Sequence, residues 1–301
     1  MDNISEKIIK LKKQKGALVL AHYYQSMDVQ GVADHVCDSF EMARRARDAG
    51  EDLLVICGVH FMAESAKILN PGKTVLLPSP GAGCPMADMI APEAVAALRE
   101  SYPDAAVVCY VNSSAAVKAA SDVCCTSSSA LRIVRALPEK RVIFIPDRNL
   151  GAYVASQVPE KEIILFEGYC PVHDCVSEND VEAAKREHPG AMLLVHPECR
   201  EAVLAHADHI GSTAEIIKAA LESDAGDFII GTEIGVVEHL ASLAPDKRFH
   251  PLKSGFICED MKITTLADVL NTLESGEHEI TLDAAVMESA RRSLERMVEL
   301  G

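Results

Sequence analysis

The feature that most constrains the fold of this chain is an internal repeat with a period near 87 residues. Three apolar segments end at His22, Tyr110 and His196, which are spaced 88 and 86 residues apart. Each end is followed by an Asp and then by a Ser or Thr in matching order; the pairs are Asp34 with Ser39, Asp122 with Ser127, and Asp208 with Thr213. Similarity at a fixed period indicates copies of one structural unit. We therefore expect three units, although the length alone suggests two domains.

Each unit has an α/β pattern. Short apolar runs, typical of parallel strands covered on both faces, alternate with helical patterns. The runs are 17–21, 53–57, 74–77, 106–110, 142–145, 162–166, 192–195 and 227–230. In each unit the second strand ends in a short motif, CGVH at 57–60, IPDR at 145–148 and GTEI at 231–234. Such alternation implies parallel sheets with crossover helices.

We therefore predict an α/β fold of three similar domains, each a small parallel sheet flanked by helices. The domains are expected to lie about a pseudo-threefold axis with the active site at the centre. The expected boundaries are 1–80, 81–167 and 168–264, and the C-terminal segment 265–301 is expected to pack back on the first unit.

The repeat singles out three of the ten cysteines. Cys84, Cys170 and Cys258 are 86 and 88 residues apart, and each follows a turn that contains glycine. Ligand sites in parallel α/β sheets lie at the carboxyl ends of the strands, so the three thiols are expected to converge on the axis. Thiolates favour zinc or iron–sulfur sites. A zinc site would need a fourth ligand, whereas a [4Fe–4S] cluster would leave one iron open as a Lewis acid.

The other cysteines are interpreted as reduced thiols. The first sixteen residues form an amphipathic helical pattern and lack the apolar core of a signal peptide, so a cytoplasmic protein without disulfides is expected. Buried free cysteines behave as small hydrophobes. Cys37, Cys57, Cys109, Cys124 and Cys199 are interpreted as buried small hydrophobes of this kind. No function is assigned to Cys175 or to the adjacent pair Cys124–Cys125.

Polar side chains cluster at the same expected strand ends. His22, Tyr24, Tyr110, His173, His196 and Glu198 are candidates for moving protons. Ser39, Ser127 and Thr213 stand at the start of helical patterns, where a hydroxyl either caps the helix or helps to bind an anion. Three such helix starts facing one cavity would bind carboxylate or phosphate.

The net charge of −16 argues against nucleic acid and anionic membranes as partners, because both attract basic surfaces. No apolar run approaches the ~20 residues that a membrane-spanning helix needs. We therefore expect small-molecule substrates.

Longer motifs resemble those of the quinolinate synthase family. They are HYYQ at 22–25, DSFEMA at 38–43, PGAGCPMADM at 80–89, CYVNSSAAVKAASDVCCTSS at 109–128, GYCPVHD at 168–174, HPEC at 196–199, GST at 211–213 and CEDMK at 258–262. The matches run in order from about residue 18 to residue 265. The one departure noted is Tyr23, where many family members have Asn.

The resemblance implies one [4Fe–4S] cluster held by Cys84, Cys170 and Cys258. It implies a transferase reaction of NAD biosynthesis, in which iminosuccinate and dihydroxyacetone phosphate give quinolinate, phosphate and water. An upstream oxidase or dehydrogenase would supply the iminosuccinate. The implied substrate contacts are His22, Ser39, Tyr110, Val111, Asn112, Ser127, His196, Pro197, Glu198 and Thr213.

Within this set, catalytic roles are expected for Tyr24, Tyr110, His173, His196 and Glu198. Glu198 is the expected base, and Tyr24 is the expected acid or orienting group. Two other classes compete with this interpretation. A diphthamide-type radical enzyme would require S-adenosylmethionine, and a non-catalytic iron–sulfur sensor would be expected to carry a basic DNA-binding module.

Overall fold

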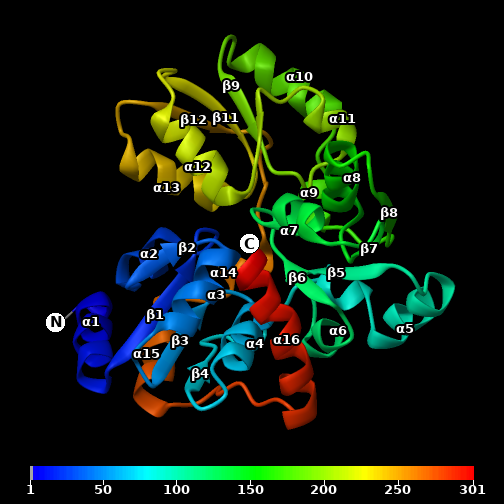
Figure 1. The fold of residues 1–301 in the computed structure, drawn as a ribbon. Helices are drawn as coiled ribbons and strands as arrows, with labels where there is room; N and C mark the ends of the chain where they lie inside the picture. Colours follow the sequence, from blue (N-terminus) through cyan, green and yellow to red (C-terminus); the bar gives the residue numbers. More distant parts are fainter. Residues whose placement is uncertain (1–2) are drawn as a thin grey trace.

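The computed structural model describes residues 3–301 and contains three four-stranded parallel sheets (Figure 1). The first sheet has β1 (Ala17–His22), β2 (His35–Cys37), β3 (Leu53–Cys57) and β4 (Thr74–Leu76). The second has β5 (Ala106–Tyr110), β6 (Val123–Cys125), β7 (Arg141–Ile145) and β8 (Glu162–Leu165). The third has β9 (Met192–Val195), β10 (His209–Ile210), β11 (Asp227–Gly231) and β12 (Arg248–Pro251). In each sheet the second strand of the chain lies outside the first, giving the orders β2-β1-β3-β4, β6-β5-β7-β8 and β10-β9-β11-β12. The predicted fold class is confirmed.

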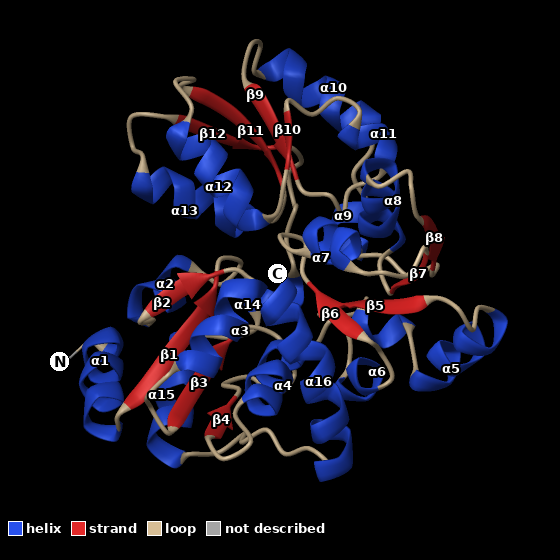
Figure 2. Ribbon diagram, viewed as in Figure 1, coloured by secondary structure: helices blue, strands red, loops and turns tan. Residues whose placement is uncertain are grey.

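Helices separate and cover the sheets (Figure 2). The first unit has α1 (Ile4–Lys15), α2 (Met27–Val32), α3 (Ser39–Asp48) and α4 (His60–Leu69). The second has the 3₁₀ turn η1 (Ala87–Met89), α5 (Pro92–Ser101), α6 (Ala115–Ala119), α7 (Ala130–Ala136) and α8 (Arg148–Gln157). The third has α9 (Pro171–Asp174), α10 (Glu178–Glu187), α11 (Glu201–Leu204), α12 (Thr213–Glu222), α13 (Ile234–Leu243) and α14 (Glu259–Lys262). The chain closes with α15 (Leu266–Ser275) and α16 (Ala284–Leu300).

The repeated aspartate has the same structural role in all three units. Its carboxylate accepts the backbone N–H of the central first strand, and its own N–H donates to the carbonyl of that same strand residue. The N–H···Oδ2 distances are 2.9 Å for Val19 with Asp34, 2.7 Å for Val107 with Asp122 and 2.8 Å for Leu193 with Asp208. The aspartate therefore fixes the connection to the edge strand.

The segment 265–301 is predicted to pack on the first unit, and the structure divides it between two units. Helix α15 lies against α1, α2 and β3 of the first unit. Helix α16 lies against α6 and β6 of the second unit and also against α4 of the first (Figure 1). Ala290, Leu294 and Met297, spaced four and three residues apart on one face, are fully buried there.

None of the helices described between residues 3 and 301 is both long enough and apolar enough to cross a membrane.

Candidate functional site

The three cysteines singled out by the repeat occupy equivalent places. Each follows the fourth strand of a sheet: Cys84 comes after β4, Cys170 after β8 and Cys258 after β12. Cys170 and Cys258 also immediately precede the short helices α9 and α14. All three line one cavity of about 300 Å³. The fold thus brings together side chains that lie 86 and 88 residues apart in the sequence.

The donor chemistry of this cavity fits a thiophilic metal group. Burial raises the pKa of Cys84 to about 12 and that of Cys258 to about 11, and it raises the pKa of Cys170 well above its usual range. Thiols with pKa values this high keep their protons at neutral pH, and a bound metal would displace those protons into solvent. His173 Nδ1 lies 3.2 Å from Cys170 Sγ, and the ligand atoms of Cys170, His173 and Glu198 lie within 4.8 Å of one another.

A second, narrower cavity adjoins the first. It is lined by eight of the predicted substrate contacts, namely His22, Ser39, Tyr110, Asn112, Ser127, His196, Glu198 and Thr213. The two cavities share Tyr24, Asn112, Glu198 and Met261. A group held by the cysteines would therefore face the polar cavity across these shared side chains.

Two predicted contacts lie just outside the polar cavity. Val111 lines a small neighbouring cavity that also contains Ser39. Pro197 lines a more open cavity that also contains Ser127. Both residues adjoin the polar cavity without lining it.

The hydroxyls of Ser39 and Thr213 do not cap their helices. The residue before each one is the cap: Asp38 accepts from the N–H of Glu41 at the start of α3, and Ser212 accepts from the N–H of Glu215 at the start of α12. Ser39 and Thr213 are therefore free to face the cavity from the first helical turn. Ser127 differs from expectation, because α7 begins at Ala130 and Ser127 instead contacts His196 Nε2 at 3.2 Å.

Two carboxylates, those of Asp38 and Glu198, line the polar cavity, and Glu198 also lines the cysteine cavity. Burial lowers the pKa of His22 and of His196 to about 3, although the Glu198 charge opposes the shift, so both imidazoles are neutral at pH 7. Burial alone would raise the pKa of Glu198, but His173 and His196 outweigh it and lower the pKa to about 2. Glu198 Oε2 lies 2.8 Å from His173 Nδ1. Glu198 Oε1 is buried and has no hydrogen-bond partner among the described residues.

Comparison with known proteins gives the family. A family model described as "Quinolinate synthetase A protein" matches residues 6–299. The chain belongs to the quinolinate synthase family. The protein named Quinolinate synthase from Caldicellulosiruptor saccharolyticus is 52% identical over 300 residues, which cover 100% of this chain and 99% of that protein. Quinolinate synthase 2 from Methanosarcina acetivorans is 48% identical over 297 residues, covering 99% and 96%. The resemblance found in the sequence motifs is confirmed.

This quinolinate synthase family member has a further buried site residue that sequence reasoning missed. Tyr24 Oη lies 3.1 Å from Thr213 Oγ1 and 2.7 Å from Thr232 Oγ1, and Thr232 Oγ1 lies 3.0 Å from His173 Nε2. Thr232 belongs to the GTEI motif at 231–234 and directly follows β11. The repeat marked the motif, but nothing in the sequence placed its hydroxyl beside Tyr24.

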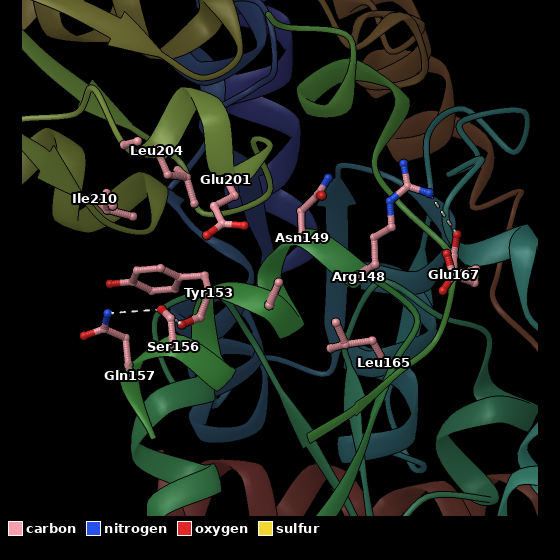
Figure 3. Close-up of a pocket in the computed structure, with 12 residues that line it drawn as sticks. Arg148, Asn149, Tyr153, Ser156, Gln157, Leu165, Glu167, Glu201, Leu204 and Ile210 are labelled. Atoms are coloured by element: carbon pink, nitrogen blue, oxygen red, sulfur yellow. Dashed lines mark hydrogen bonds between the residues drawn. The ribbon is translucent and has the colours of Figure 1, made fainter. Parts of the chain in front are cut away.

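A separate cavity of about 450 Å³ opens between α8 and α11 (Figure 3). Its lining includes Tyr153, Leu165 and Leu204 but no predicted site residue. At its edge, Asn149 Nδ2 donates to the carbonyl oxygen of Glu198 at 3.0 Å. In this quinolinate synthase family member the wider cavity therefore adjoins the backbone that carries Glu198, while the predicted catalytic residues line the two central cavities.

Proposed function

We propose that this protein is an iron–sulfur quinolinate synthase that condenses iminosuccinate with dihydroxyacetone phosphate to give quinolinate, phosphate and water, in NAD biosynthesis. One observation carries the proposal. The cavity lined by Cys84, Cys170 and Cys258 shares Tyr24 and Glu198 with the polar cavity next to it. Family membership supports the same conclusion.

The proposed cofactor is one [4Fe–4S] cluster per chain, held by Cys84, Cys170 and Cys258. Three soft sulfur donors in a buried cavity suit iron–sulfur chemistry. When bound, such a cluster supplies an iron without a protein thiolate that acts as a Lewis acid on a substrate oxygen.

The polar cavity supplies groups that bind anions without carrying positive charge. Ser39 and Thr213 are the first residues of α3 and α12, so their hydroxyls stand beside free backbone N–H groups. Ser127 and the two neutral imidazoles add further hydrogen-bonding groups. We assign these groups to the carboxylate and phosphate oxygens of the substrates.

Proton transfer is assigned to Glu198 and Tyr24. Glu198 is ionised at pH 7 and has one buried oxygen free to accept a proton from a substrate carbon or nitrogen. Burial raises the pKa of Tyr24 well above its usual range, so its hydroxyl keeps its proton at neutral pH and either donates it or orients the substrate. His173 Nδ1 lies 2.8 Å from the Glu198 carboxylate and helps to hold it in place, and Tyr110 lines the polar cavity.

The chemistry of iminosuccinate also suggests its source. An imine of this kind arises by two-electron oxidation of an amino acid, so an oxidase or dehydrogenase would supply it. We place the reaction in the cytoplasm, where thiols such as those of Cys84, Cys170 and Cys258 remain reduced.

Anaerobic purification followed by iron and sulfide analysis and a quinolinate assay tests the proposal. We expect about four irons per chain and quinolinate formation. Cys84→Ala, Cys170→Ala and Cys258→Ala should each lose the cluster and the activity. Cys175→Ala is the matched control, because Cys175 is exposed and lies outside the cysteine cavity. A colourless, zinc-loaded and fully active protein would contradict the proposal.

A further inference from the structure

Lys118 of α6 is a buried cation that the proposed chemistry does not use. It is 0% exposed, and a lysine is rarely buried to this extent unless it is paired. Its Nζ donates to the carbonyl oxygen of Ser113 and lies 5.4 Å from the centroid of the Phe61 ring. Within residues 3–301 it forms no ion pair with a carboxylate. The bond to Ser113 is therefore a charge-assisted hydrogen bond in a dry environment, which is the strong kind.

Ser113 closes the turn that carries Asn112. The N–H of Ser113 donates to the carbonyl oxygen of Val111 at 2.8 Å, which makes a three-residue turn with Asn112 at its centre. The N–H of Val111 donates to the carbonyl oxygen of Cys125 at 2.8 Å, so the first residue of the turn is tied to β6. Lys118 holds the last residue of the turn by its carbonyl oxygen. The turn is therefore fixed at both ends.

The position of Lys118 is itself fixed by the core. Its carbonyl oxygen accepts from Ser293 of α16 at 2.9 Å. At the start of α6, the buried carboxylate of Glu64, from α4, accepts from the N–H of Ala115 at 3.0 Å. Helices of the first unit and of the C-terminal segment thus hold α6, and with it the ammonium group that contacts Ser113.

Asn112 is the residue of this turn that faces both central cavities. Its Oδ1 atom is buried and has no hydrogen-bond partner among the described residues. A buried amide oxygen without a partner is costly, and a donor group of the substrate would satisfy it. The direction in which Asn112 Oδ1 points depends on the backbone of the turn.

We propose that Lys118 is a positioning residue that holds the turn 111–113 so that Asn112 Oδ1 accepts a hydrogen bond from the substrate. The inference rests on the proposed function, because iminosuccinate is the substrate that Asn112 is proposed to contact. Lys118 acts through Ser113 and does not touch the substrate. Because the turn is held before the substrate arrives, binding does not have to order it.

Two substitutions separate the charged donor of Lys118 from the volume of its side chain. Lys118→Met keeps an unbranched side chain and removes the donor, whereas Lys118→Arg keeps a charged donor. We expect Lys118→Met to raise the KM for iminosuccinate about tenfold with kcat within about threefold, because it removes ground-state binding. Lys118→Arg should stay within about threefold of wild type in both constants. Equal increases in KM would mean that Lys118 acts only through packing, which would overturn the proposal.

Lys12→Met is the matched control. Lys12 is also buried, it pairs with Asp34, and its Nζ donates to the carbonyl oxygen of Val32 at 2.6 Å. None of these three residues lines either central cavity. Lys12→Met should lower the stability and leave KM within about twofold. A rise in KM as large as in Lys118→Met would reflect a general loosening of the fold and would count against positioning.

A double-mutant cycle with Asn112→Ala tests whether Lys118 acts through Asn112. If it does, adding Lys118→Met to Asn112→Ala should change KM by less than about twofold. A further rise as large as in the wild-type background would place the effect of Lys118 elsewhere and would overturn the proposal.

Amide hydrogen exchange of the holoenzyme gives a readout that needs no turnover. In Lys118→Met the N–H of Ser113 should exchange about tenfold faster or more, while the amides of β5 and β9 keep their wild-type rates. Unchanged exchange at Ser113 would overturn the proposal even in an active enzyme. If Lys118→Met does not fold, Lys118→Arg decides, since a folded Lys118→Arg variant with fast exchange at Ser113 would also overturn it. A wild type that makes no quinolinate but shows the expected exchange would overturn only the proposed function.

Discussion

Glu198 carries its negative charge at a place to which water has little access, and neighbouring side chains stabilise that charge. The residue is only 3% exposed. Removing water from a carboxylate disfavours its ionised form, yet His173 Nδ1 at 2.8 Å and His196 Nδ1 at 3.4 Å reverse the effect. The other carboxylate oxygen, Glu198 Oε1, has no hydrogen-bond partner among the described residues. One oxygen is therefore held while the other is available for chemistry.

Replacing Glu198 by Gln tests its assignment as the base. The amide keeps the shape but cannot take up a proton at neutral pH. We expect turnover to fall by about 10²- to 10⁴-fold, with iron content retained. Glu201→Gln is the control, because Glu201 is exposed and lines the separate cavity between α8 and α11. Full turnover of Glu198→Gln with an intact cluster would show that another group is the base.

The sequence predicts some residues of the site better than others. Cys84, Cys170 and Cys258 could be selected from ten cysteines because a thiol at the same place in three repeats is a strong pattern. The caps were not separated from the cavity hydroxyls, because Ser212 and Thr213 are adjacent and only the backbone decides which of them caps α12. Thr232 was missed because its importance depends on contacts with residues 59 and 208 positions away.

At the scale of elements, the sequence predicted eight of the twelve strands found within residues 3–301, to within about one residue at each end. The four missed strands, β2, β6, β10 and β12, all lie at sheet edges. The first three contain only two or three residues, and β12 (RFHP) lacks an apolar run. Edge strands pair on one side only, so local pattern defines them weakly unless they contain an apolar run, as the edge strands β4 and β8 do.

Helix α16 is the element whose packing the sequence predicted least well, and it offers a test of stability. Leu294 is fully buried between the first and second units. Leu294→Ala should lower the free energy of unfolding by about 2–5 kcal/mol, because it removes buried methyl groups and leaves a cavity. Urea denaturation measures the change. Arg292→Ala, on the exposed side of α16, should change it by less than about 0.5 kcal/mol. Equal effects would mean that α16 contributes little to the core.

At the scale of the whole molecule, the three units do not pack against one another to the same extent. One continuous core of buried side chains joins the first and second units with α16, and within residues 3–301 its one buried member from the third unit is Met261 of α14. The third unit has cores of its own, which other units reach through partly buried side chains such as Tyr24 and Tyr153. The repeat predicts three equal units, but it cannot show that one additional helix, α16, packs against two of them.

The unequal packing of the three units affects the polar cavity. His196, Glu198 and Thr213 come from the third unit, whereas His22 and Tyr110 come from the first and second. The cavity has a volume of only about 40 Å³, which is room for a few water molecules. Its width therefore depends on how the third unit sits against the other two, and polar contacts between the second and third units help to set that position.

Asp174 is the centre of those contacts. Its carboxylate accepts from Arg148 and Asn149 of α8, at 3.1 and 2.9 Å, and from Arg200 beside α11, at 2.7 Å. Burial would raise the pKa of Asp174, but the hydrogen bonds, led by that from Arg200, lower it from 3.8 to about 2. A carboxylate with a lowered pKa stabilises the folded state above its unfolded pKa, and this contribution is lost as the pH falls toward about 2.

Asp174→Asn should therefore destabilise the protein at pH 7, by about 1–2 kcal/mol once solvent screening at the half-exposed Arg200 is allowed for. Urea midpoints measured from pH 7 down to the lowest pH at which the wild type folds provide the test. The difference between variant and wild type should be constant above about pH 5 and should shrink below about pH 4, as the wild-type carboxylate takes up its proton. Asp224→Asn, at an exposed position, is the control. A difference that persists unchanged at acid pH would mean that Asp174 acts through shape and hydrogen bonding rather than through its charge.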